Sequence, residues 1–292
     1  MLPGPVSTGD AHGPGLFGAP RRSPAPALRD THPVRPTVSQ IAIAPVKSLR
    51  LALVERVQVD LSGVVGDRGY AMLTARGHLL SVTKHPGLFR TRASADPAAG
   101  SLRLELPDGR VLQQVVGLGA ARTGLFYGRE RPCREVLGEF CEALSALAGE
   151  PVTLVAMTDG PAVDRPGEGA VSVQSAAALA DLAPAAGCAH PLDPRRFRMT
   201  FTVAGIGAYE EESWLGRRVR LGTAVIRPRG NVGRCAATTF DPDTGAKTAE
   251  TLKALTATRA GVASSEPLPF GVHAEVLTPG VVGVGDAVEV LD

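Results

Sequence analysis

Short stretches in which apolar and polar residues alternate, separated by turn residues, constrain the fold of this chain most. In residues 53–61, Val57 and Val59 alternate with polar neighbours, which is the period of a strand with one buried face. Pro107-Asp108-Gly109 separates two further stretches of this kind and indicates a hairpin. Short strands with closely spaced turns are typical of a small β-barrel or sandwich.

The remaining pattern adds strands and a few helices. We expect strands at 39–46, 53–61, 70–74, 102–106, 111–116, 198–203, 218–227, 236–240, 272–277 and 287–291. We expect helices at 134–148, which would end at Gly149, at 176–182, with Ser175 as its N-cap, and at 252–258. Strands and helices do not alternate as in a parallel sheet, so the prediction is a mainly β fold with a few helices (α+β).

The N-terminal stretch differs from the rest of the sequence. Residues 1–37 contain eight of the 24 prolines and show no apolar periodicity, so we expect a disordered leader there. This stretch also has no continuous apolar run of the kind found in a secretory signal. Ordered sequence is expected from residue 38 onward.

Charge and cysteine content exclude several classes of protein. The 31 basic and 29 acidic side chains leave a net charge of +2, which does not indicate a nucleic-acid or membrane-surface partner. No apolar run is long enough to span a membrane. The four cysteines, Cys133, Cys141, Cys188 and Cys235, include no C-x2-C pair, so neither a closed zinc site nor a disulfide framework is expected. We expect a cytoplasmic protein.

Cys235 is the most informative single residue. It ends the segment Gly230-Asn-Val-Gly-Arg-Cys235, a loop interrupted by glycines between two predicted strands. The preceding Arg234 favours the thiolate form of its neighbour. Taken locally, a ligand-binding thiol and a half-buried structural cysteine fit this segment equally well.

Basic residues at strand ends could meet at an anion. Lys47-Ser48 follows the first strand, Arg68 follows a glycine turn, and Arg198 precedes another strand. Arginine and lysine beside hydroxyl groups suit a phosphate, although each residue taken separately fits an ordinary surface charge.

Other sequence patterns speak against hydrolase sites. The run Glu210-Glu211-Glu212 is expected to be a solvated turn, in which one residue could have a structural role. The histidines lack zinc-hydrolase spacing, and no G-x-S-x-G motif is present.

At these residues the sequence resembles the two-part MOSC architecture. In the first part the resemblance rests on the stretches 44–48 (Ala-Pro-Val-Lys-Ser), 66–68 (Gly-Asp-Arg) and 83–86 (Thr-Lys-His-Pro). In the second part it rests on 196–198, 209–214, 233–235, 238–239, 241–245, 270–271 and 284–286. The order and spacing of these short motifs together make the resemblance specific.

The resemblance implies a fold and a set of site residues. It implies a MOSC N-terminal β-barrel domain at 38–122 and a MOSC domain, also of β-barrel type, at 123–292. It implies that Cys235 is the catalytic residue and the metal ligand of a molybdenum cofactor (molybdopterin). The cofactor contacts it implies are Lys47, Ser48, Arg68, Ser175, Arg198 and Arg234, with Thr200 standing where relatives have asparagine.

The resemblance also implies a function, with alternatives. The first is an oxidoreductase that reduces small N-hydroxylated compounds with electrons from a separate iron–sulfur or flavin donor. The second is a carrier that holds sulfur or the molybdenum cofactor on Cys235. The third is a degenerate barrel that binds nothing.

Overall fold

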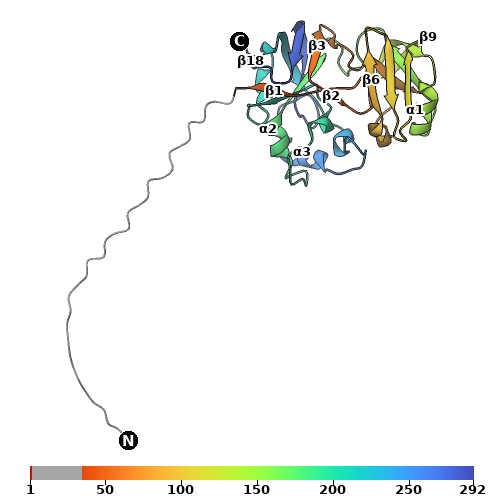
Figure 1. Cartoon of the computed structure of the whole chain (residues 1–292). Coiled ribbons are helices and arrows are strands. Elements are labelled where there is room, and N and C mark those ends of the chain that lie inside the picture. Colours follow the sequence, from red (N-terminus) through yellow and green to blue (C-terminus); the bar gives the residue numbers. More distant parts are fainter. Residues whose placement is uncertain (2–34) are drawn as a thin grey trace. The chain divides into compact units, whose positions relative to one another are not determined.

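The computed structural model describes Met1 and residues 35–292, and Arg35–Asp292 form one compact unit (Figure 1). The expected leader therefore falls almost entirely outside the described residues. The strands are β1 (Thr37–Ile43), β2 (Ala52–Val54), β3 (Arg56–Asp60), β4 (Gly63–Val64), β5 (Tyr70–Thr74), β6 (Arg92–Asp96), β7 (Ser101–Glu105), β8 (Val111–Val115), β9 (Leu118–Phe126), β10 (Arg129–Val136), β11 (Val152–Met157), β12 (Val171–Ser175), β13 (Phe201–Ala204), β14 (Val219–Leu221), β15 (Ala224–Asn231), β16 (Val272–Thr278), β17 (Gly280–Gly283) and β18 (Val288–Val290). The helices are α1 (Phe140–Ala148), α2 (Ala176–Leu182) and α3 (Thr251–Arg259), with 3-10 turns η1 (Pro86–Arg90), η2 (Pro194–Phe197), η3 (Glu210–Trp214) and η4 (Ala236–Thr239). The prediction of a mainly β fold with a few helices is confirmed.

The largest sheet contains eight strands in the order β18-β14-β15-β16-β12-β13-β1-β2. Its neighbouring strands are antiparallel except for β12 and β13, which pair in parallel with α2 between them in the chain. The sheet is therefore antiparallel apart from this one strand–helix–strand unit, in agreement with the expectation that the chain does not form a parallel sheet. Of the unit's two strands, β13 corresponds to the strand expected at 198–203, whereas β12 was not predicted because its residues are mostly buried and give little alternation.

Three smaller sheets complete the unit, in the orders β5-β11-β10-β9, β17-β3-β4 and β6-β7-β8. Within residues 35–292 none of the sheets closes into a hydrogen-bonded ring, so the expected barrels are seen as open sheets. Figure 1 shows β6, β9 and α1 at one end of the unit and β18, α2 and α3 at the other. The domain division at residue 122 stays a prediction, and β9 runs across it.

Two apolar cores underlie these sheets. The eight-stranded sheet buries a cluster whose members include Val173, Phe201, Ile226, Val272 and Trp214. A second cluster packs β7, β11, η1 and α1 together through Leu88, Leu102, Leu104, Phe140, Leu144 and Leu154. These cores hold the loops at the strand ends in fixed positions, and those loops carry the functional residues.

Several element boundaries differ from the prediction. The segment expected as one helix at 134–148 begins as the end of β10, and α1 starts only at Phe140, although it ends at Gly149 in a left-handed cap as expected. The strand expected at 236–240 is the 3-10 turn η4. That turn forms because Thr239 and Thr238 donate their hydroxyl groups to the backbone carbonyls of Ala236 and Cys235, which strand geometry would not allow.

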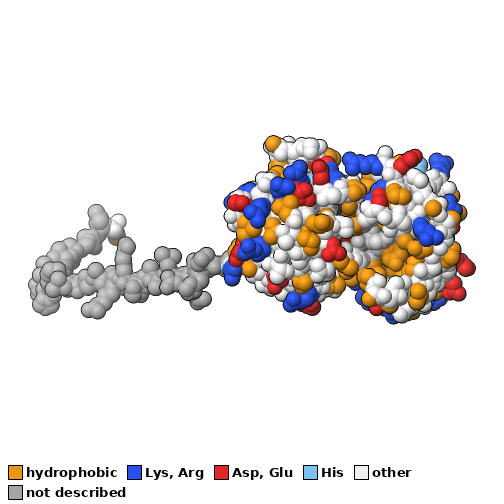
Figure 2. Space-filling view, turned by 90° about the horizontal axis from the view of Figure 1, so that it is seen from above, with side chains coloured by type: hydrophobic (Ala, Val, Ile, Leu, Met, Phe, Trp, Pro, Cys, Tyr) orange, Lys and Arg blue, Asp and Glu red, His pale blue; other side chains and the backbone are white. Residues whose placement is uncertain are grey.

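The surface carries charges of both signs. On the face seen in Figure 2, lysine and arginine side chains are interspersed with aspartate and glutamate side chains. Among the helices of residues 35–292, none has both the length and the apolar character required to cross a membrane.

Candidate functional site

A cavity of about 480 Å³ brings together residues that are far apart in the sequence. Seven of the predicted site residues line it: Lys47, Ser48, Arg68, Arg198, Thr200, Arg234 and Cys235. They come from the loops after β1, β4, η2 and β15, where β1 and β15 belong to the eight-stranded sheet and β4 to the sheet β17-β3-β4. The predicted convergence of cations and thiol is therefore present in the structure.

Cys235 is the exposed member of the four cysteines, all of which are free. Its backbone is fixed because Arg234 N donates to Pro267 O at 3.2 Å and Thr238 N donates to Cys235 O at 3.2 Å. Within residues 35–292, no three His, Cys, Asp or Glu side chains cluster as metal ligands would. The chain thus offers one accessible thiol to this cavity.

Arg234 uses its hydrogen-bond donors on the protein itself. Its Nε donates to Phe270 O at 3.0 Å and its Nη1 donates to Phe197 O at 2.8 Å. The rings of Phe197 and Phe270 stack with centroids 4.0 Å apart and lie beneath the guanidinium. Burial lowers the pKa of Arg234 to about 9, so the side chain is still cationic at neutral pH beside the thiol. Its contribution at this position is a fixed positive charge.

Arg68 and Arg198 form a second pair of fixed cations. Arg68 forms an ion pair with the buried Asp67, whose Oδ1 accepts a hydrogen bond from Ala44 N at 2.7 Å. Arg198 donates from Nη2 to Leu49 O at 2.8 Å, and its guanidinium lies 5.3 Å from the ring centroid of Phe89. Burial, together with the nearby charge of Arg68, lowers the pKa of Arg198 to about 10. Both side chains are held in place before any ligand arrives.

Unusual backbone conformations are concentrated at this cavity. In the part of the chain that the structure describes, six non-glycine residues have a positive φ. Four of them line the cavity: Ser48 at 78°, Arg68 at 51°, Tyr127 at 50° and Arg198 at 54°. Non-glycine residues in the left-handed region cost free energy, and such residues tend to cluster at functional sites. The strain therefore marks the same cavity that the side-chain chemistry marks.

Lys47 is paired with a carboxylate. Its Nζ lies 3.0 Å from Asp164 Oδ1 and 5.0 Å from the ring centroid of Tyr127. Burial acts to lower the pKa of Lys47, but Asp164 and Tyr127 together outweigh it and the pKa is raised above its usual 10.5. Lys47 is thus a cation that already has an anionic partner.

Models of two protein families match this chain. The MOSC N-terminal beta barrel domain matches residues 35–123, and the MOSC domain matches residues 149–289. The chain belongs to the MOSC family. A comparison with curated proteins finds no match.

Solved structures of similar proteins include the YUAD protein from Bacillus subtilis, at 13% identity and a TM-score of 0.43. That match covers 87% of this chain and 93% of the other. YiiM from Geobacillus stearothermophilus matches at 19% identity and a TM-score of 0.33, over 48% of this MOSC chain and 67% of the other.

Three of the residues that line the MOSC cavity, Thr200, Ser172 and His273, are polar. Thr200 Oγ1 lies 3.2 Å from Ser172 Oγ, and Ser172 pairs across the sheet with His273. His273 Nδ1 lies 3.0 Å from Glu168 O, and because a carbonyl oxygen only accepts, Nδ1 carries the proton. Burial lowers the pKa of His273 below 6.5, so the ring is neutral at neutral pH. Thr200, which the resemblance places where relatives have asparagine, thus lines the cavity, and its role as a cofactor contact stays a prediction.

Ser175 is the one predicted site residue that the structure does not bring to the cavity. Its hydroxyl accepts hydrogen bonds from Ala177 N and Ala178 N at 3.1 and 3.3 Å, and donates to Gly207 O at 2.9 Å. The residue is fully buried and caps α2, as the sequence predicts. Because all its hydrogen-bonding capacity is used in the fold, we correct its assignment as a cofactor contact.

Sequence reasoning missed two cavity residues and did not single out one buried acid. Tyr127 lies in the tight turn Tyr127-Gly128 between β9 and β10, and Asp164 lies in the proline- and glycine-rich segment before β12. Gly128 was an available signal for a tight turn at Tyr127, whereas no local pattern marked Asp164. Glu211 is fully buried and so is the residue of the run to which the expected structural role applies, while Glu212 forms an ion pair with Arg259.

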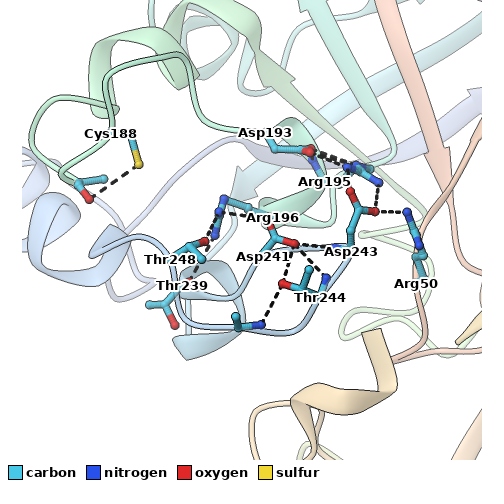
Figure 3. A network of polar contacts seen from close by, with 12 residues as sticks. Arg50, Cys188, Asp193, Arg195, Arg196, Thr239, Asp241, Asp243, Thr244 and Thr248 are labelled. Carbon is cyan, nitrogen blue, oxygen red and sulfur yellow. Dashed lines mark hydrogen bonds and ion pairs between the residues drawn. The ribbon is translucent and has the colours of Figure 1, made fainter. Parts of the chain in front are cut away.

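An arginine–aspartate network holds the turn that follows η4 in this MOSC domain (Figure 3). Arg195 donates to both oxygens of Asp243 at 2.7 and 2.8 Å, and Arg50 forms an ion pair with the same carboxylate. Arg196 donates to Thr239 O at 3.3 Å, at the end of η4. The network links the turn to the segments that carry Lys47 and Arg198, and so fixes the position of Cys235 relative to the cations.

Proposed function

We propose that this MOSC protein binds the molybdenum cofactor through the thiolate of Cys235 and reduces small N-hydroxylated compounds. The observation that supports this proposal is an exposed thiol at a cavity lined by four fixed cations from distant segments: Lys47, Arg68, Arg198 and Arg234. A thiol alone would be a weak argument, and the cations give the cavity a second, anion-binding function.

The residues present fit this cofactor. A soft thiolate suits a metal whose other ligands are the dithiolene sulfurs of a pterin, so a single protein ligand is sufficient. The pterin ends in a phosphate, for which the ammonium of Lys47 and the guanidinium of Arg68 are suitable partners; the Ser48 hydroxyl donates to Leu80 O at 3.2 Å and would have to release it to donate to the phosphate. In the structure the carboxylate of Asp164 forms an ion pair with Lys47, at the position where we propose that the phosphate binds. A volume of about 480 Å³ lies in the range of cofactor pockets.

The proposed reaction is a two-electron reduction. The N–O bond of the substrate breaks, two electrons and two protons are consumed, the oxygen leaves as water, and the nitrogen gains an N–H bond. When bound, the molybdenum centre supplies the redox chemistry, and a separate reduced iron–sulfur or flavin protein supplies the electrons. The chain's own contribution is to hold the phosphate with Lys47 and Arg68, to present the Cys235 thiolate, and to orient the substrate.

A carrier role is the second candidate, because the exposure of Cys235 would also allow transfer of sulfur or cofactor to another protein. In either role Cys235 must not be consumed in a disulfide, which a reducing cytoplasm would ensure. In a carrier Cys235 would hold a persulfide, and the protein would show no turnover.

Turnover and sulfur content separate the two candidates. The protein loaded with cofactor is assayed with benzamidoxime and a chemical reductant, beside Cys235→Ala and the control Cys188→Ala, whose thiol is half-buried outside the cavity lining. Turnover that is lost only in Cys235→Ala supports the reductase. Cyanide-releasable sulfur on Cys235 without turnover in the wild type would replace the reductase with the carrier.

A further inference from the structure

Residues 159–169, here called the strap, run from the end of β11 to the start of β12 along the cavity. Several hydrogen bonds hold the first half of the strap, most of them from Arg131. Arg131 donates to both oxygens of Asp159 at 2.7 and 3.0 Å and to Pro161 O at 2.9 Å, and Ala162 N donates to Arg68 O at 2.7 Å. The strap is therefore fixed at its start to the same segment that carries one of the cavity's cations.

The second half of the strap is held by contacts across the cavity. Asp164 pairs with Lys47 at 3.0 Å, Arg165 forms an ion pair with Glu266, and Glu168 O accepts a hydrogen bond from His273 Nδ1 at 3.0 Å. Each partner lies on a different segment, and Lys47 and His273 line the cavity, so this half of the strap depends on side chains outside the strap. Loss of one partner would loosen it without unfolding the sheet beneath.

Asp164 is the one carboxylate among the described residues that line the cavity, and it faces a set of cations. Its side chain is 51% exposed while that of Lys47 is 13% exposed. Ion pairs with one exposed partner are weak, because water competes for the exposed group. A phosphate group carries more negative charge and three acceptor oxygens, so it would compete successfully for the buried ammonium.

We propose that Asp164 is a removable counter-ion: an incoming phosphate group displaces it from Lys47 and thereby releases the second half of the strap. The inference rests on the proposed function, because it takes Lys47 as a contact of the cofactor's phosphate. Anion binding and opening of the cavity are then one coupled event. Release of the strap would widen the entrance to the cavity for a bulky cofactor.

The pair Arg165–Glu266 provides a matched control. Glu266 lies beside Gly233, where its Oε2 is 2.7 Å from the position that a Cβ would take, and it is not among the residues that line the cavity. The substitution Glu266→Gln removes a tie of the strap and leaves Lys47 and Asp164 in place. It therefore separates loosening of the strap from competition for Lys47.

The experiment measures the affinity of the full chain for inorganic phosphate by calorimetry, and hydrogen–deuterium exchange over residues 159–169. We expect phosphate to raise exchange in the wild type. Asp164→Asn should bind phosphate about fivefold more tightly, the factor that an ion pair of this exposure corresponds to. Its strap should exchange fast without phosphate and show no further rise with it. Glu266→Gln should exchange faster than the wild type, and its phosphate affinity should rise less than that of Asp164→Asn, because Asp164 still competes for Lys47.

The outcomes that overturn the inference differ from those that overturn the proposed function. Unchanged strap exchange on phosphate binding to the wild type, or equal affinities of wild type and Asp164→Asn, would show that Asp164 is no counter-ion for this site. A Lys47→Met variant that binds phosphate as well as the wild type would instead remove Lys47 from the proposed cofactor site. Loss of phosphate binding in Lys47→Met keeps the proposed site, whatever the result with Asp164→Asn.

Discussion

Arg68 donates a hydrogen bond from Nη2 to the carbonyl oxygen of Arg198 at 2.9 Å, and both residues have a left-handed backbone. The two residues lie 130 positions apart and belong to the two segments matched by the MOSC N-terminal and MOSC family models. A side chain that holds the backbone of a second cation fixes the spacing of positive charges in the cavity. This contact makes Arg68 a structural residue as well as a proposed ligand contact.

Replacing Arg68 should therefore cost stability, while replacing Lys47 should not. Arg68→Met leaves the buried carboxylate of Asp67 without its cation, and we expect the free energy of unfolding to fall by about 3 kcal/mol. Lys47→Met breaks a pair with a half-exposed carboxylate and should cost under about 1 kcal/mol. Urea denaturation of both variants checks this difference. Equal losses in the two variants would contradict the role assigned to Arg68.

Gly245 should tolerate no side chain. It has a φ of +72°, and a Cβ there would lie 2.2 Å from the backbone oxygen of Pro86. Gly109 has a φ of +87° with no atom within 4 Å of that position, so Gly109→Ala isolates the conformational cost of about 1 kcal/mol. We expect Gly245→Ala to cost about 3 kcal/mol, because the turn must also move away from η1. Similar midpoints of the two variants in thermal unfolding would show that the turn is not packed as described.

The buried carboxyl of Glu211 should make stability fall with rising pH. Burial raises its pKa from 4.5 to about 7, and neither oxygen has a hydrogen-bond partner among the described residues. The folded protein then binds this proton more tightly than the unfolded chain, so the benefit is complete below about pH 4.5 and is lost as the pH rises through 7. Glu211→Gln should be more stable than the wild type by about 3 kcal/mol at pH 8 and by little at pH 5. A stability difference that does not change with pH in urea denaturation would contradict this account.

The fold could be predicted where the local pattern and the tertiary structure agree. The hairpin of β7 and β8, the helix α2 with its Ser175 cap, and β5 were predicted from alternation, capping and turn residues alone. The prediction of a strand at 236–240 was wrong, because threonine hydroxyl groups donate to nearby backbone carbonyls and stabilise a 3-10 turn there. The high β-propensity of threonine gives no sign of such local hydrogen bonds.

Site residues that belong to short sequence motifs could be predicted, whereas residues that reach the site only through the tertiary fold could not. Cys235, Lys47, Arg68 and Arg198 were found because short motifs mark them, and the structure brings them to one cavity. Asp164 was not found, because a carboxylate in a loop has no local signal until the fold brings it within 3.0 Å of Lys47.

The most direct test of the central claim is the molybdenum content of the wild type and of Cys235→Ala, purified side by side after expression in cells that make the cofactor. Removing an exposed thiol should leave the fold intact, so both proteins should give the same circular dichroism spectrum and the same unfolding midpoint. We predict that the wild type contains molybdenum and that the variant has lost most of it. Equal molybdenum in the two proteins would contradict the assignment of Cys235 as the metal ligand.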